Sequence, residues 1–136
     1  MVAVLRRTLE RSHGGLIALA AETQAFLAGL EVTGEGLYKV QLGLEEVIRN
    51  LVLHGSGSST GLIDVAIEVG AHRVEVLVED DGLPFDPRLA PPFDPSLPLE
   101  ARTGGGMGLA LLRLMMDEIH YERLGSKNRL RLVVGF

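Results

Sequence analysis

The sequence predicts an α/β (α+β) fold, a two-layer sandwich whose mixed, largely antiparallel sheet carries its helices on one face. Two pairs of strand patterns predict the sheet, at residues 63–69 and 74–79 and again at residues 120–124 and 129–136. Within each pair, apolar and polar residues alternate and only a short turn separates the strands, which is typical of antiparallel neighbours. At 136 residues the chain is long enough to bury its own core, so we expect residues 1–136 to form a single domain.

Composition narrows the class of protein further. The chain is 46% apolar but only 4% aromatic, with neither Trp nor Cys, so its core is built mainly from aliphatic side chains. Disulfides and thiolate metal sites are excluded. The N-terminal segment lacks the cleavage signature of a signal peptide, and no apolar run approaches the ~20 residues that span a bilayer. We therefore expect a cytoplasmic protein that does not contact membranes.

The charge of the chain counts against nucleic-acid binding. Its formal net charge is −5 at pH 7, whereas a nucleic-acid surface needs a concentrated basic patch. Basic residues do gather toward the C-terminus, but alternation on the predicted strands explains them as solvated faces: Arg113, Arg123, Lys127, Arg129 and Arg131.

A strand and a helix are expected first in the chain. Residues 2–9 read as a short strand with Val2 and Val4 on one face. Ser12 is well placed to cap the following helix, because a serine oxygen can accept a hydrogen bond from a free backbone N–H of the first turn. An apolar stripe at helical spacing ends at Gly29 or shortly after: Leu16, Leu19, Ala20, Thr23, Phe26, Leu27 and Leu30.

The second helix, which ends near His54, carries two lines of side chains. One is an apolar stripe, and the other is polar, with Glu46, Asn50 and His54 four residues apart. A carboxylate one turn before a carboxamide can form the start of a site, because the carboxylate can accept a proton and the amide oxygen can bind a hard cation such as Mg²⁺. From this helix alone, ordinary solvated residues are the simpler interpretation of both.

A proline-rich stretch and a glycine cluster follow the first strand pair. All six prolines lie between Pro84 and Pro98, so residues 83–103 form neither a central strand nor a continuous helix. Such a long loop is commonly a lid or binding loop, although it can also be a poorly ordered excursion. Residues 104–108 are nearly all glycine and precede a helix at residues 109–116, whose free N–H groups attract phosphate. Glycine clusters can also be mere hinges.

Three patterns therefore occur in a definite order: Glu-x-x-x-Asn on a helix, Asp-x-Gly at the end of a strand, and a glycine cluster at a helix start after a long loop. Together they resemble the ATP-binding domain of the histidine-kinase-like (GHKL) ATPase superfamily. The resemblance is greatest to its anti-sigma-factor serine/threonine-kinase branch, which consists of small stand-alone domains. It extends from the first helix to the last strand and implies the GHKL ATPase fold.

The resemblance implies a role for each matching residue. Glu46 corresponds to the general base, Asn50 to the Mg²⁺ ligand, Asp80 to the acceptor for the adenine amino group and Gly82 to the glycine beside the base. A flexible ATP lid spans about residues 83–104, and backbone amides after it hold the phosphates: Gly104, Gly105, Gly106, Gly108 and Leu109. The family often has Thr in its last strand, supporting the adenine pocket, and Arg131 is expected at that position.

The function that this resemblance implies is an ATP- and Mg²⁺-dependent serine/threonine kinase that phosphorylates an antagonist protein and sequesters a sigma factor. It also implies a homodimer. Two alternatives stay open. A non-catalytic, ATP-gated regulator that binds proteins would need Asn50 and Asp80 but not Glu46, and a simple ATPase would use water in place of the acceptor hydroxyl.

Overall fold

The computed structural model describes residues 2–54, 60–89 and 106–136. The strands in these residues form one open sheet with the order β1-β2-β3-β5-β4. Each pairing in this sheet is antiparallel, so the described part has no parallel neighbours. The strands are β1 (Ala3–Glu10), β2 (Leu62–Val69), β3 (Arg73–Asp80), β4 (Glu118–Leu124) and β5 (Lys127–Gly135).

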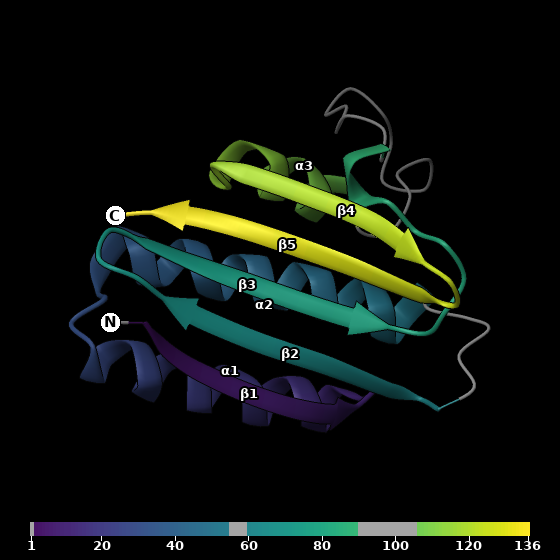
Figure 1. Cartoon of the computed structure of the whole chain (residues 1–136), viewed down its shortest axis with the longest axis horizontal. Helices are drawn as coiled ribbons and strands as arrows, with labels where there is room; N and C mark the ends of the chain where they lie inside the picture. The colour runs from purple at the N-terminus through teal and green to yellow at the C-terminus, as the bar shows by residue number, and fades with distance from the viewer. Residues whose placement is uncertain (1, 55–59, 90–105) are drawn as a thin grey trace.

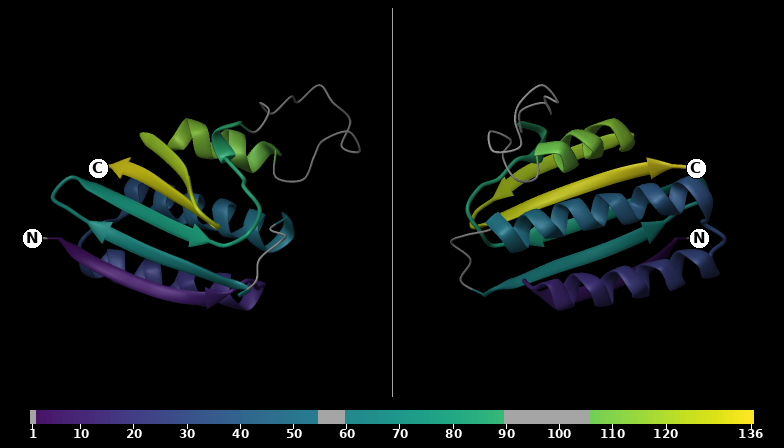
Figure 2. Two further views of the ribbon diagram at one scale, coloured as in Figure 1. Left: turned by 45° about the vertical axis from the view of Figure 1, so that its right-hand side comes forward. Right: turned by 180° about the vertical axis from the view of Figure 1, so that it is seen from behind.

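The helices form a second layer on one face of this sheet (Figures 1 and 2). They are α1 (His13–Gly29), α2 (Gly34–His54) and α3 (Gly106–Met115). Helix α1 packs on β1 and α2, whereas α2 lies over β3 and β5 and also contacts α3. A short 3-10 helix, η1 (Pro87–Leu89), packs against α3 and β4. The predicted two-layer sandwich is confirmed. None of the helices in the described parts is long and apolar enough to cross a membrane.

The core lies between the two layers, as the alternation of the strands predicted. Inward positions of β2, β3 and β5 are buried, and they meet the apolar stripes of α1 and α2. The first strand differs in one detail. Val2 and Val4 do share a face, but they are 58% and 41% exposed, and the buried side chain of β1 is Leu9.

Helix α1 begins at the predicted N-cap, but the left-handed residue that follows its C-terminal end is not a glycine. The Gly15 amide donates to Ser12 Oγ at 3.1 Å, which is the expected N-cap. Gly29 is the last helical residue, yet the chain turns into the left-handed region at Glu31, with φ of 62°. This turn lets the Val32 amide donate to the Leu27 carbonyl at 2.9 Å. A non-glycine residue therefore occupies the position where glycine is usually found.

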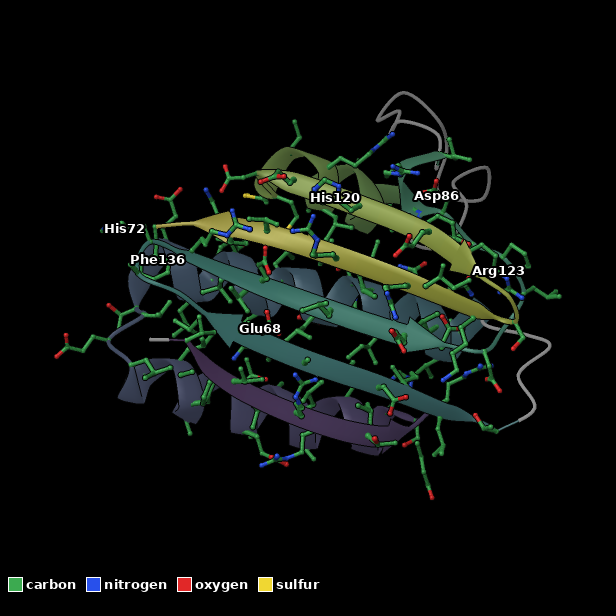
Figure 3. All side chains as sticks on the ribbon, viewed as in Figure 1. Glu68, His72, Asp86, His120, Arg123 and Phe136 are labelled. Carbon is green, nitrogen blue, oxygen red and sulfur yellow. The ribbon has the colours of Figure 1, made fainter. Side chains whose placement is uncertain are left out.

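The face of the sheet without helices carries charged side chains (Figure 3), several of which form pairs. Arg131 donates to Glu75 at 2.8 Å, and Arg129 donates to Glu79 at 2.7 Å. Burial alone would raise the pKa of the Glu75 carboxyl, but hydrogen bonds and charge from Arg73 and Arg131 outweigh it and lower that pKa. Arg129 and Arg131 are thus matched by neighbouring carboxylates, in agreement with the solvated face that the sequence predicted, whereas Arg123 of β4 donates to the Gly82 carbonyl at 2.7 Å.

Candidate functional site

A small pocket, with a cavity volume of about 20 Å³, lies among α2, α3 and the adjoining ends of β3 and β5. Three residues singled out in the sequence, Asn50, Asp80 and Leu109, meet here, although they come from three separate elements. The remaining lining residues are mostly apolar: Val47, Leu51, Val78, Phe85, Pro87, Tyr121, Asn128 and Leu130.

Helix α2 supplies the polar side chains of one wall. Glu46 and Asn50 are only 8% and 7% exposed, so they are not ordinary solvated residues. The Asn50 side-chain nitrogen donates to the Glu46 backbone carbonyl at 2.7 Å. The side-chain oxygen of Asn50, Oδ1, is therefore the atom that can bind a ligand. Within the described residues, no three His, Asp or Glu side chains gather as a metal site. A single amide oxygen nevertheless fits Mg²⁺, which usually takes few protein ligands together with phosphates and water.

The carboxylate of Glu46 lies directly against the start of α3. A Cβ added to Gly108 would stand 1.7 Å from Glu46 Oε2 and 2.4 Å from its Cδ, so only glycine leaves room for this carboxylate. Its other oxygen, Oε1, accepts a hydrogen bond from Arg49 Nη1 at 3.2 Å. Glu46 is therefore held at the positive end of a helix, where free backbone N–H groups also attract anions.

The glycine cluster overlaps the helix more than the sequence predicted. Helix α3 begins at Gly106 rather than at Leu109, so Gly106 and Gly108 belong to its first turn. Leu109 follows them and is buried in the pocket wall. Gly104 and Gly105 lie outside the described residues.

Asp80 ends β3 and forms the polar floor of the pocket. It is 6% exposed. Its Oδ2 accepts the Gly82 amide at 2.9 Å, and Asn128 Nδ2 lies 3.4 Å from the same oxygen. An ionised carboxylate only accepts hydrogen bonds, so this floor suits a ligand with an amino group.

The expectation for Arg131 is wrong, and Asn128 takes its place. The register of β3 and β5 pairs Asp80 with Asn128 and pairs Leu77 with Arg131. Arg131 consequently points to the outer face, toward Glu75. Parity along the strand could have shown this, because Asn128 is an even number of residues from the inward Leu130 whereas Arg131 is not. Sequence reasoning also did not identify Tyr121, which lines the pocket from β4.

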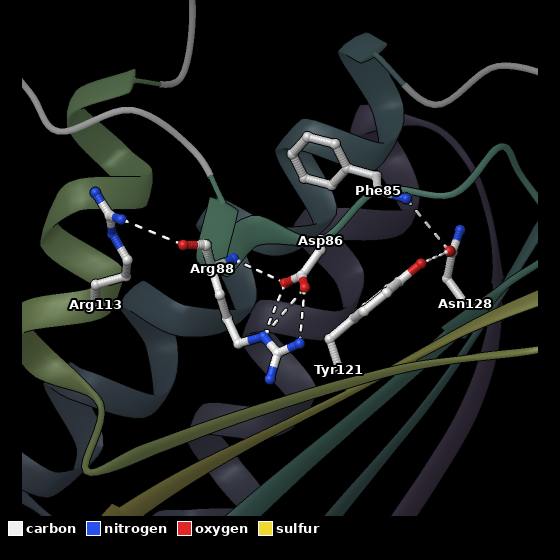
Figure 4. A network of polar contacts seen from close by, with 6 residues as sticks. All are labelled: Phe85, Asp86, Arg88, Arg113, Tyr121 and Asn128. Carbon is white, nitrogen blue, oxygen red and sulfur yellow. Dashed lines mark hydrogen bonds and ion pairs between the residues drawn. The ribbon is translucent and has the colours of Figure 1, made fainter.

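The first part of the predicted lid, residues 83–89, is docked beside the pocket (Figure 4). The Arg88 amide donates to Asp86 Oδ1 at 3.0 Å, and its guanidinium pairs with Asp86 Oδ2 at 2.8 Å. The hydrogen bond from Arg88 lowers the pKa of Asp86 despite its partial burial. Arg113 of α3 reaches the Arg88 carbonyl at 3.4 Å. The remainder of the lid, residues 90–104, lies outside the described residues.

Fold and site together define a class: a two-layer domain in which a carboxylate at a strand end and a glycine-bearing helix start face one pocket. Residues 12–134 match the model of the histidine kinase-like ATPase domain, and the chain belongs to that family. The resemblance drawn from the three sequence patterns is thereby confirmed.

Curated relatives and one solved structure agree with this assignment. An anti-sigma F factor from Clostridium novyi is 28% identical over 113 residues, 81% of this chain and 77% of that protein. A serine-protein kinase RsbW from Bacillus thuringiensis is 31% identical over 84 residues, 59% of this chain and 52% of that protein, so the match spans about half of that kinase. The RsbU and RsbW domains of a Mycobacterium tuberculosis protein superpose with a TM-score of 0.63 at 15% identity, covering 98% of this chain and 32% of that one. This last likeness concerns the fold.

Proposed function

We propose that the chain is an ATP-dependent serine/threonine protein kinase of the anti-sigma-factor type, which phosphorylates an antagonist protein and sequesters a sigma factor. One observation carries the proposal: the Glu46 carboxylate is held against Gly108 at the start of α3, while Asn50 and Asp80 line the adjoining pocket. A candidate base, a candidate cation ligand and an anion-attracting helix start thus lie together.

Each residue of the site has a separate role in this proposal. Asp80 accepts a hydrogen bond from the adenine amino group with Gly82 beside it, and Asn50 Oδ1 binds Mg²⁺. Backbone amides at the start of α3 surround the phosphates, and Gly104 and Gly105 are assigned to the same task by family resemblance. Bound ATP supplies the phosphoryl group, with Mg²⁺ neutralising charge on its oxygens. Glu46 Oε2 accepts the proton of the acceptor hydroxyl.

Calorimetric titration with ATP and Mg²⁺ tests the pocket. The wild-type protein should bind, and Asn50→Ala and Asp80→Asn should each weaken binding. Arg129→Gln, whose side chain lies on the outer face beside Glu79, is the matched control and should bind as the wild type does. If the wild type does not bind, the proposal fails.

Glu46→Gln separates the kinase from the alternatives. It keeps the shape of the side chain but loses the base, so ATP should still bind while transfer to a cognate antagonist falls by about 100-fold or more. A wild type that binds ATP but never transfers phosphate would be an ATP-gated regulator. Steady ADP release without any protein acceptor would identify a simple ATPase.

The proposed partners are a sigma factor and its antagonist, since the relatives are named for an anti-sigma factor and a serine-protein kinase. We place these interactions in the cytoplasm, where ATP and RNA polymerase are found. A homodimer is supported by the hollow between α1 and α2, where Ile17 and Tyr38 are 69% and 59% exposed. Sedimentation equilibrium should give the mass of two chains, and Ile17→Glu should lower it to one.

A further inference from the structure

Arg49 of α2 follows two acidic residues by one helical turn, and none of the roles above uses it. Its Nη1 donates to Glu46 Oε1 at 3.2 Å, and its Nη2 donates to Glu45 Oε1. Residues three and four apart on a helix are neighbours, so one guanidinium can reach both carboxylates. The planar fork of arginine holds its donors in a fixed relation, which a lysine ammonium does not. Glu46 is thus tied to a second carboxylate on the same helix.

The two carboxylates differ in exposure. The Glu46 side chain is 10% exposed, whereas those of Glu45 and Arg49 are 52% and 40% exposed. Arg49 therefore connects a buried carboxylate to one that lies in solvent. A half-exposed ion pair contributes little to stability, so this contact can be removed without unfolding the chain. Its main effect should be on the orientation of Glu46.

The orientation of Glu46 decides which of its oxygens faces the start of α3. Oε2 lies 1.7 Å from the position of a Cβ on Gly108, whereas Oε1 lies 3.0 Å from it. The described residues direct one side-chain donor at this carboxylate, Arg49, and that donor approaches Oε1. Oε2 is then left as the proton acceptor, on the side where the free N–H groups of α3 attract phosphate.

We propose that Arg49 is a positioning residue for phosphoryl transfer, which holds Glu46 Oε1 so that Oε2 faces the acceptor hydroxyl. In this step the hydroxyl oxygen bonds to the γ-phosphorus of ATP, the bond from that phosphorus to the β–γ bridging oxygen breaks, and the hydroxyl proton passes to Oε2. ADP leaves with the electron pair of the broken bond. The inference rests on the proposed function, because it presumes that Glu46 is the base. It gives a role to a residue that the pattern Glu-x-x-x-Asn leaves variable.

Single-turnover transfer of labelled phosphate from ATP, with Mg²⁺, to the antagonist that the wild type phosphorylates tests this role. Arg49→Met keeps a long side chain but removes both donors. It should slow transfer by about 10-fold to 100-fold, because misplacing a catalytic group by 1 Å costs up to about 100-fold. Arg49→Lys keeps one charged donor and should recover at least about fivefold of that loss. The dissociation constant for ATP should change by less than about threefold, since the guanidinium is already engaged by two carboxylates.

A double-mutant cycle shows whether Arg49 acts through Glu46. In a Glu46→Gln background, Arg49→Met should slow transfer by less than about threefold more, because two changes that remove one interaction are not additive. Glu45→Gln, which removes the exposed partner of Arg49, should slow transfer by about twofold to fivefold. Lys39→Met is the matched control, since Lys39 pairs with Glu35 at 3.1 Å nearer the N-terminal end of α2. It should leave transfer unchanged.

The outcomes separate this inference from the proposed function. If the wild type does not transfer phosphate, the proposed kinase fails and the positioning role fails with it, whether or not ATP binds. If the wild type transfers phosphate and Arg49→Met does so equally fast, the positioning role is overturned while the proposed function stands. An equal loss in the wild-type and Glu46→Gln backgrounds would also overturn it, because Arg49 would then act on its own. If ATP affinity falls as far as transfer does, Arg49 is a phosphate ligand, which likewise overturns the role.

Discussion

Replacing Gly108 by Ala should leave the fold intact and reduce phosphoryl transfer by at least about 100-fold. The added Cβ would stand 1.7 Å from Glu46 Oε2, whereas a non-bonded carbon needs roughly 3.4 Å from an oxygen. The obstructing atoms are the end of a flexible side chain rather than backbone. The carboxylate can therefore retreat, by about 1.7 Å, and give up its contact with the start of α3.

The two consequences of this retreat differ in size. Ala stabilises a helix by up to about 1 kcal/mol relative to Gly. Moving Glu46 loses its pairing with Arg49, a partner whose side chain is 40% exposed, and such pairs contribute at most about 1 kcal/mol. The free energy of unfolding should thus change by less than about 1 kcal/mol. Misplacing a catalytic group by 1 Å or more costs about 100-fold in rate, so transfer should fall by at least that factor.

Urea unfolding and single-turnover phosphorylation of the antagonist, run side by side, measure both effects. Gly29→Ala is the control, because a Cβ there would meet nothing within 4 Å at the end of α1. It should leave transfer unchanged. Loss of more than about 2 kcal/mol of stability in Gly108→Ala would show that Glu46 cannot move. Unchanged transfer in that variant would show that the observed position of Glu46 has no part in catalysis.

Three further predictions concern stability. Thr23 is fully buried and its hydroxyl has no hydrogen-bond partner among the residues that the structure describes, so Thr23→Val should raise the free energy of unfolding by about 1 kcal/mol in urea titration. Glu31→Gly should raise it by about 0.5–1 kcal/mol, because glycine adopts the observed φ of 62° without strain; a lower value would mean that the turn is not strained. The pKa of Asp86 is lowered in the folded state by its hydrogen bond from Arg88, so this carboxylate stabilises the fold above about pH 4 and less as pH falls below that value. The stability difference between wild type and Asp86→Asn should accordingly shrink from pH 6 to pH 3, and a difference that is constant with pH would contradict the assignment.

The features that the sequence predicted correctly are those that repeat with a fixed period along a strand or a helix. Alternation identified the buried faces of β2, β3 and β5, since every second side chain of a strand points the same way. Four-residue spacing placed Glu46 and Asn50 on one line of α2, and the structure buries both. These features depend on local geometry alone.

What the sequence could not predict depends on how distant elements meet. The contact between Glu46 and Gly108 requires the relative position of α2 and α3, which no periodicity encodes. Strand parity could exclude Arg131, but only the register of β3 and β5 sets Asn128 opposite Asp80. A shift of one residue moves every side chain to the other face, so a small error in register changes the assignment completely.

The strand order has a consequence for the synthesis of this protein. Strand β5 is made after β4 but lies between β3 and β4, and within the described sheet β4 pairs with β5 alone. While a ribosome is still translating residues 127–135, β4 has no strand to pair with, and Asn128 is not yet in place opposite Asp80. The earlier hairpin of β2 and β3 can form as soon as it emerges, since domains generally fold from the N-terminal side during translation. A nascent chain should therefore acquire much of its sheet before it acquires a finished pocket.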